Sequence, residues 1–113
     1  MEISRIIEDK ISYISLSGNL LGEKDSNPII ESISKSIEND SNLFVVDVKE
    51  LQYVNSTGIS ALISILTKSR NAGGEMILIN LPSQLKKILE LTKLDKVFPL
   101  AEDKETAVKL LNR

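Results

Sequence analysis

A short run of polar residues follows an apolar strand pattern near the middle of the chain. Ser56-Thr57-Gly58 comes directly after Asn55, at the point where a helical pattern of apolar residues begins. A hydroxyl at the start of a helix lies among unpaired backbone N–H groups, where negative charge is favoured. A phosphoryl group on Ser56 would therefore be tolerated by the helix that carries it. Ser56 can equally be a plain helix cap, which is the more common role for serine at such a position.

The composition excludes most catalytic chemistry. The chain has no Cys and no His, which removes disulfides, thiolate catalysis, zinc sites built from soft ligands and the usual general base near neutral pH. The formal net charge is −2, without a basic stripe that would hold nucleic acid. We therefore predict a protein that is not an enzyme, uses no metal or cofactor and does not bind nucleic acid.

The apolar segments are all too short to cross a bilayer, and Met1 to Arg5 contain an acid and no long apolar core. We therefore expect a cytoplasmic protein without membrane insertion. The length of 113 residues and the hydrophobic content of 42% are those of one globular domain over residues 1–113. We expect this domain to be a monomer when free.

The positions of apolar residues predict strands that alternate with helices. Strands around 3–7 and 11–16 form a hairpin across the polar turn at 8–10, and a loop opens at Gly18 and Gly22. The later elements are expected in this order: a helix over 28–38 capped by Asn27, a strand over 43–48, a loop over 49–55, a helix from 56 to a stop at Gly73-Gly74, a strand over 76–79, a helix over 82–91, an edge strand over 97–98 and a helix capped by Asp103.

This order of elements predicts an α/β fold. Right-handed crossovers would give a mixed sheet of four to five strands with about four helices packed against it. Binding sites in such folds lie at the carboxyl ends of the strands. Asp47 lies near the end of the predicted strand over 43–48 and Ser56 follows the next loop, so we expect both at one edge of the sheet.

The residues around Ser56 resemble the signature of the STAS domain, the family of bacterial anti-sigma factor antagonists. The resemblance lies in Phe44 to Val48 and in Asn55 to Ile59, with the apolar Leu51 and Val54 between them. It continues in Leu16-Ser17-Gly18 with the following leucines and in the turn Gly73-Gly74-Glu75-Met76, so that it covers nearly the whole chain. The resemblance implies a single STAS-like domain.

The resemblance also implies a function for Ser56. In this family the matching serine is phosphorylated by a partner that is both a serine kinase and an anti-sigma factor, and a metal-dependent serine phosphatase removes the phosphate. The unphosphorylated form binds the anti-sigma factor and releases a sigma factor. The family usually has Asp before this serine, whereas this chain has Asn55, which keeps an oxygen able to cap a helix but carries no charge.

The residues around Ser56 are candidates for contact with the partner, and each also has a structural interpretation. Asp47 can contact a partner or accept hydrogen bonds that order a loop. Gly58 can admit a partner backbone or let the helix pack closely on the sheet, and Thr57 can control access to Ser56 or simply begin the helix. Of Leu20 and Leu21, we expect one in the core and the other, Leu21, in a docking surface.

Two other classes of function remain open. One is a STAS-type structural subunit of a larger complex, such as a lipid-transport ATPase, in which the serine region contacts its partner without a phosphate cycle. The other is a nucleotide or small-molecule binder at the strand ends, but the chain lacks a Gly-rich phosphate loop with a lysine.

Overall fold

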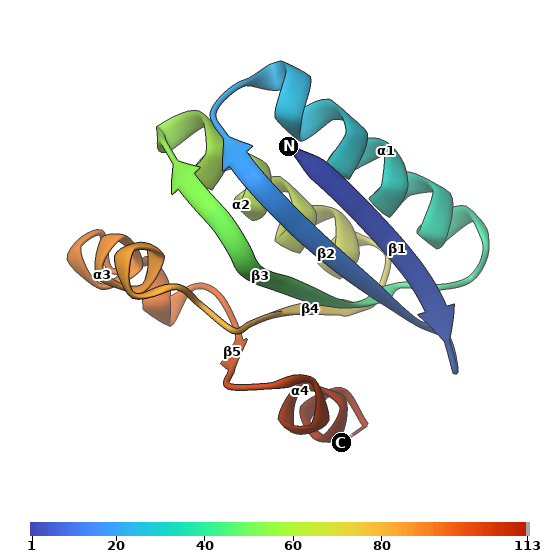
Figure 1. The fold of residues 1–113 in the computed structure, drawn as a ribbon. Coiled ribbons are helices and arrows are strands. Elements are labelled where there is room, and N and C mark those ends of the chain that lie inside the picture. Colours follow the sequence, from blue (N-terminus) through green and yellow to red (C-terminus); the bar gives the residue numbers. More distant parts are fainter. Residues whose placement is uncertain (113) are drawn as a thin grey trace.

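A computed structural model describes residues 1–112 as one five-stranded sheet with four α-helices and a short 3₁₀ helix, η1 (Figure 1). The elements in chain order are β1 (Glu2–Glu8), β2 (Ile11–Leu20), α1 (Glu23–Glu38), β3 (Leu43–Val54), α2 (Ser56–Asn71), β4 (Glu75–Ile79), α3 (Ser83–Leu91), η1 (Leu94–Lys96), β5 (Leu100–Ala101) and α4 (Lys104–Leu111). The predicted α/β fold with a mixed sheet and four helices is confirmed.

The strands lie in the sheet in chain order, from β1 to β5. Strand β1 pairs antiparallel with β2, and each later strand is parallel to its neighbour. Both residues of the β1–β2 turn, Asp9 and Lys10, have positive φ angles of 50° and 67°, as in the tight turns that suit twisted hairpins. The predicted hairpin is therefore present.

Helices α1 and α2 cover one face of the sheet, and α4 lies on the other (Figure 1). The main core lies under α1 and α2, where Ile29, Leu62 and Ile65 are completely buried. Leu85 and Leu89 attach α3 to the same core. A smaller cluster on the opposite face includes residues of β2 to β4 and Ala107 of α4. The side chain of Lys104 also lies 4.2 Å from the centre of the Tyr13 ring.

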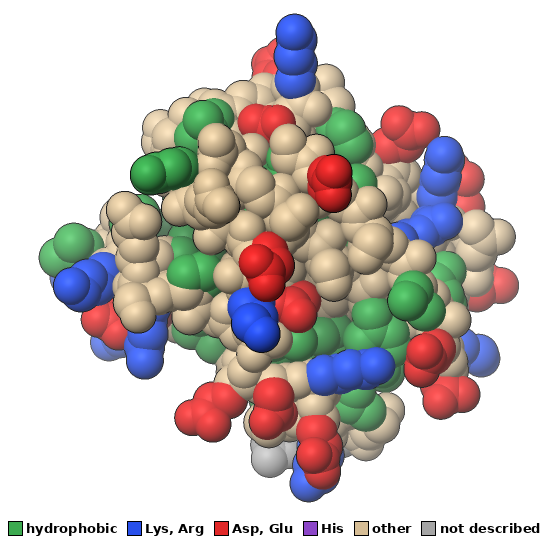
Figure 2. All heavy atoms as spheres, viewed as in Figure 1, with side chains coloured by type: hydrophobic (Ala, Val, Ile, Leu, Met, Phe, Trp, Pro, Cys, Tyr) green, Lys and Arg blue, Asp and Glu red, His purple; other side chains and the backbone are tan. Residues whose placement is uncertain are grey.

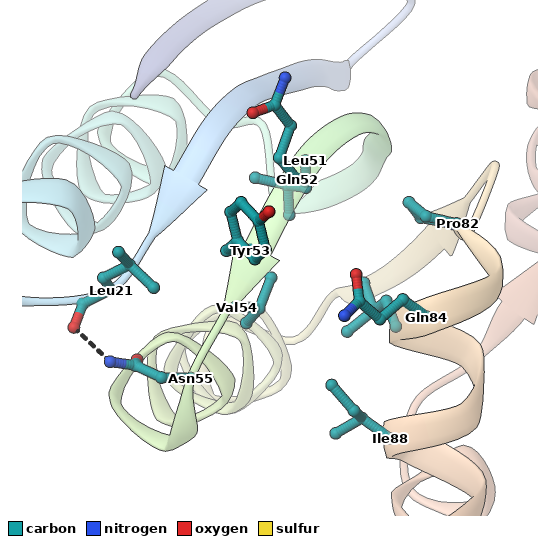
Figure 3. A pocket seen from close by; sticks show the side chains of 10 residues that line it. Leu21, Leu51, Gln52, Tyr53, Val54, Asn55, Pro82, Gln84 and Ile88 are labelled. Carbon is teal, nitrogen blue, oxygen red and sulfur yellow. Dashed lines mark hydrogen bonds between the residues drawn. The ribbon is translucent and has the colours of Figure 1, made fainter.

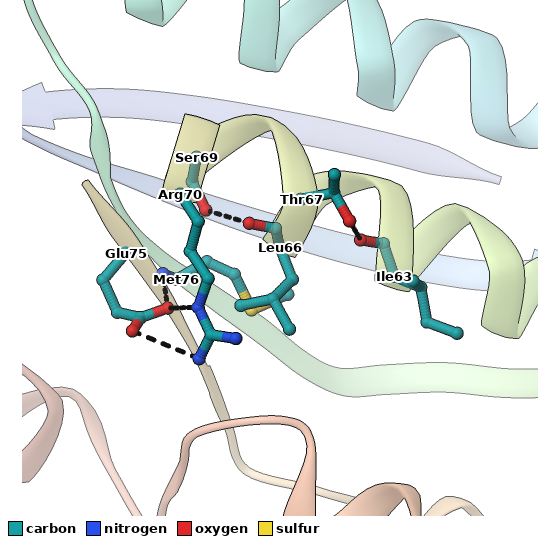
Figure 4. Close-up of polar contacts among 7 residues, drawn as sticks. All are labelled: Ile63, Leu66, Thr67, Ser69, Arg70, Glu75 and Met76. Carbon is teal, nitrogen blue, oxygen red and sulfur yellow. Dashed lines mark hydrogen bonds and ion pairs between the residues drawn. The ribbon is translucent and has the colours of Figure 1, made fainter. Parts of the chain in front are cut away.

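Helix α2 ends in a set of local polar contacts (Figure 4). The guanidinium of Arg70 donates to Glu75 at the start of β4, with Nε 3.0 Å from Oε1 and Nη2 3.3 Å from Oε2. Gly73 then turns the chain with a φ of 82°, which glycine adopts without steric cost. The predicted stop at Gly73-Gly74 is confirmed.

The start of α1 was predicted wrongly. The helix begins at Glu23 with Gly22 as its N-cap, and Pro28 lies inside the helix rather than at its first position. Pro28 is the sixth residue of α1, so the helix lacks the hydrogen bond that an N–H at this position would donate to the carbonyl oxygen of Lys24. Glu23 and Asp25 in the first turn favour the earlier start through the helix dipole.

Strands β2 and β3 are longer than the sequence pattern predicts. The predicted loop over 49–55 is mostly strand, because β3 runs to Val54 and pairs with β2 as far as Leu20. The pairing of β2 with β3 has two register shifts, and one of these shifts lies beside Gly18. The bulged pairing hides the simple alternation by which a strand is predicted.

The last strand was also predicted wrongly. Strand β5 is Leu100–Ala101, not 97–98. The backbone N–H of Phe98 instead donates to Leu94 in a helical turn at 3.0 Å, and the Phe98 ring is buried in the main core. Asp103 caps α4 as predicted, with its Oδ1 accepting from the Thr106 N–H at 2.9 Å.

Candidate functional site

Ser56 is the first residue of α2, and it is exposed. The N-cap is Asn55, whose Oδ1 accepts from the backbone N–H of Gly58 at 2.9 Å. The interpretation of Ser56 as the cap of this helix is therefore wrong. Within residues 1–112 the Ser56 hydroxyl makes no side-chain hydrogen bond, so it is available to an incoming group.

Asn55 also ties the start of α2 to the loop after β2. Its Nδ2 donates to the carbonyl oxygen of Leu21 at 2.7 Å (Figure 3). The backbone N–H of Leu21 in turn donates to Asp25 Oδ2 at 3.0 Å. Leu21 is thus held through both of its backbone polar groups, beside the helix that begins with Ser56.

Gly58 lets α2 start close against the sheet. A Cβ atom on Gly58 would lie 2.2 Å from the carbonyl oxygen of Leu20 and 2.8 Å from Val54 Cγ1. Side chains do not fit at such distances. The structure therefore supports the packing role of Gly58. Thr57 is an exposed residue of the first turn.

The two leucines at the end of β2 separate as predicted. Leu20 is completely buried, whereas Leu21 is 42% exposed. Tyr53, the second-to-last residue of β3, is 59% exposed. Large apolar side chains are therefore presented to solvent next to the exposed serine.

Two hollows meet at this site. One, of about 230 Å³, is bounded by Leu21 and Tyr53 on one side and by Ile88 of α3 on the other (Figure 3). The second, of about 440 Å³, is lined by Ser56 and again by Ile88. Val54 and Asn55 line both. Among the residues 1–112 that line the two hollows, none has a carboxylate, amine or guanidinium group.

Asp47 does not lie in this group. It is in the middle of β3, paired in register with Ser15 and Ile79, and its Oδ1 accepts from the backbone N–H of Lys49 at 2.9 Å. Seven more residues of β3 separate Asp47 from the strand end, a span of roughly 20 Å. The expectation of one shared edge is wrong, because β3 continues beyond the end of β4. The hydrogen bond between Asp47 and Lys49 is a contact within β3, since the loop that Asp47 was expected to order is mostly strand.

The titratable groups with altered pKa values, Tyr13 and Asp103, lie on the side of the sheet that α4 covers. Burial raises the pKa of Tyr13, with help from Glu8 and Asp9. The backbone N–H of Thr106 lowers the pKa of Asp103 at the start of α4. Both perturbations have structural causes, in packing under α4 and in helix capping.

Sequence reasoning missed Tyr53 and the α3 side of the site. Tyr53 falls in the predicted loop over 49–55, and Ile88 falls in the predicted helix over 82–91. The position of Tyr53, two residues before Asn55, could have indicated that Tyr53 lies near the site. No sequence signal places Ile88 beside Ser56, because the contact depends on how α3 packs.

The residues that the structure describes contain no cluster of acidic, His or Cys side chains that could hold a metal ion. None of the helices in residues 1–112 combines the length and apolar character needed to span a membrane. On the face of the molecule seen in Figure 2, acidic and basic side chains are interspersed, and no continuous basic surface is visible there.

A family model for the STAS domain matches residues 3–107. The chain therefore belongs to the STAS domain family. BtrV of Bordetella bronchiseptica, provisionally named an anti-sigma factor antagonist, is 20% identical over 105 residues, which cover 91% of this chain and 90% of BtrV.

Solved structures share the fold. The Thermotoga maritima protein TM1081, also provisionally named an anti-sigma factor antagonist, has a TM-score of 0.87 at 15% identity, with 98% of this chain and 95% of that chain covered. The anti-sigma factor antagonist SpoIIAA in its unphosphorylated form has a TM-score of 0.72 at 16% identity, with 95% and 94% covered. The phosphorylated form of SpoIIAA, a Bacillus cell fate determinant, has a TM-score of 0.73 at 17% identity, with 96% and 99% covered.

Proposed function

We propose that this protein is an anti-sigma factor antagonist that is switched by phosphorylation of Ser56. The unmodified protein binds an anti-sigma factor with serine kinase activity in the cytoplasm and so frees a sigma factor. Phosphorylation of Ser56 by that kinase ends the binding, and a metal-dependent serine phosphatase restores it. The protein itself acts without catalysis and is a monomer when free.

One observation carries the proposal: an exposed serine hydroxyl stands at the first position of α2, at the edge of an apolar hollow. The cap of the helix is supplied by Asn55, so modification of Ser56 costs the helix no capping bond. The family of the chain and the names of BtrV and SpoIIAA agree with this function. SpoIIAA also has a phosphorylated form.

The energetics favour release of the partner without unfolding. A phosphate at the start of α2 interacts favourably with the helix dipole, by about 0.3 to 1 kcal/mol. A partner that covers the apolar hollow would have to remove water from this charge, or oppose it with its own negative groups, at a cost of several kcal/mol. A difference of about 3 kcal/mol weakens binding roughly 100-fold.

The test is the affinity of three variants for the cognate anti-sigma factor kinase. We expect Ser56→Ala to bind like the wild type and Ser56→Asp to bind at least about 100-fold more weakly. Ser60→Ala is the matched control, because Ser60 is an exposed serine one turn further along α2. Thermal melting should show that Ser56→Asp is as stable as the wild type.

Equal affinities of Ser56→Asp and Ser56→Ala would refute the switch. Stable capture of a transporter subunit, with no kinase bound, would instead support a permanent structural subunit. Asn55 would be compatible with that role, since it provides the helix cap without the charge usual in the family.

A further inference from the structure

The loop that carries Leu21 is held in place by one nearby residue of α1 and by one residue from a distant part of the chain. Asp25 accepts from the Leu21 N–H at 3.0 Å, and Asn55, 34 residues away, donates to the Leu21 carbonyl oxygen at 2.7 Å. An exposed apolar residue in a short loop would ordinarily move freely. Here both hydrogen-bonding groups of its backbone are paired, so the direction of its Cα–Cβ bond is held.

The Asn55 side chain performs two tasks that need a carboxamide. Its Oδ1 accepts from Gly58 N–H at the start of α2, and its Nδ2 donates to Leu21. Asp or Ser would also cap the helix. A carboxylate, however, has no hydrogen to donate, and its oxygen would face the carbonyl oxygen of Leu21. A serine side chain is too short to cap the helix and reach Leu21 at the same time.

We propose that Asn55 is a positioning residue for partner recognition, which fixes Leu21 as an apolar anchor beside Ser56. The partner that fits this surface is a protein with an apolar pocket for Leu21 next to the groups that face the serine. Leu21 borders the same hollow as Tyr53 and Ile88, so the anchor continues into an apolar docking surface. Binding to a surface that is already ordered loses less entropy than binding to a mobile loop. The identity of the partner rests on the proposed function, whereas the positioning of Leu21 does not.

The positioning is tested without any partner, by ¹⁵N relaxation of the labelled protein. In the wild type the backbone order parameters of Leu21 and Gly22 should be near the value of about 0.85 for rigid backbone, and in Asn55→Ser they should fall below about 0.6. Asn42→Ser is the matched control, because Asn42 Nδ2 donates to the Ala72 carbonyl at 3.0 Å at the other end of α2. Asn42→Ser should leave Leu21 rigid.

A Leu21 amide that stays as rigid in Asn55→Ser as in the wild type would overturn the proposal. Asn55→Asp provides a second variant that keeps the cap and lacks the donor, and it should loosen the loop in the same way. Order parameters in α2, from Ile59 onward, should be unchanged in both variants, which separates loss of the Leu21 contact from loss of the helix.

The role in recognition is tested by a double-mutant cycle with the anti-sigma factor kinase. Asn55→Ser should weaken binding about tenfold in the wild-type background and by less than about twofold when Leu21→Ala is already present. Additive effects of the two substitutions would refute action through Leu21. If the kinase does not bind even the wild type, the proposed function fails, while the relaxation measurement still decides whether Asn55 positions Leu21.

Discussion

Substitution of Gly58 by alanine should destabilise the protein, although alanine is the better helix former. The gain in helix propensity is about 1 kcal/mol. Against it, the new Cβ would lie 2.2 Å from the Leu20 carbonyl oxygen, so α2 must move by about 1 Å from the end of β2. Overpacking against rigid backbone costs about 3 kcal/mol. We therefore expect a net loss of about 2 kcal/mol in the free energy of unfolding.

The assay is guanidinium denaturation of wild type, Gly58→Ala and Gly22→Ala. Gly22 is the matched control, because a Cβ there meets nothing within 4 Å and its backbone is extended. Gly22→Ala should lose no more than about 1 kcal/mol through its weaker capping. Gly58→Ala should lower the melting temperature by about 8 °C with an unchanged denaturant slope. A Gly58→Ala protein as stable as the wild type, or more stable, would refute the close packing of α2 on β2.

Two further predictions concern neighbouring residues and pH. Leu20→Ala should cost about 2 to 5 kcal/mol in a denaturation experiment because Leu20 is completely buried, whereas Leu21→Ala should stay within about 0.5 kcal/mol; similar losses would contradict the placement of the two side chains. The Thr106 N–H lowers the pKa of Asp103 in the folded protein below the ordinary value of 3.8. The Asp103 carboxylate therefore stabilises the fold at pH values above 3.8, and this stabilisation is lost as the pH falls through the pKa of the folded protein. Stability measured from about pH 6 down to about pH 3 should therefore fall less in Asp103→Asn than in the wild type, and identical pH profiles would count against this cap.

The fold could be predicted from the sequence where the local signals agreed with the packing. The hairpin turn, the stop at Gly73 and the cap at Asp103 depend on nearby residues, and they were found. Helix α1 was misplaced because Asn27-Pro28 is a strong local start signal, whereas the helix begins at Glu23, where Glu23 and Asp25 in the first turn favour its start.

The site could be predicted only in part. The start of α2 at Ser56 and the different burial of Leu20 and Leu21 could be predicted, because a helix start and an apolar pair before a glycine are visible in the sequence. The position of Asp47 was misjudged because the bulged pairing of β2 and β3 extends both strands. The contact between Asn55 and Leu21 joins residues 34 positions apart, and the contribution of α3 depends on tertiary packing. Neither has a local signal.

The proposed switch requires that the Ser56 hydroxyl receives a phosphate in the cell. The most direct measurement is the intact mass of the protein purified from its own cells, beside the Ser56→Ala variant and the Ser60→Ala control. We expect a fraction of the wild type and of Ser60→Ala to be heavier by one phosphoryl group, and we expect no such fraction in Ser56→Ala. A phosphoryl increment that persists in Ser56→Ala, or none in the wild type under conditions where the kinase is active, would contradict the proposed switch.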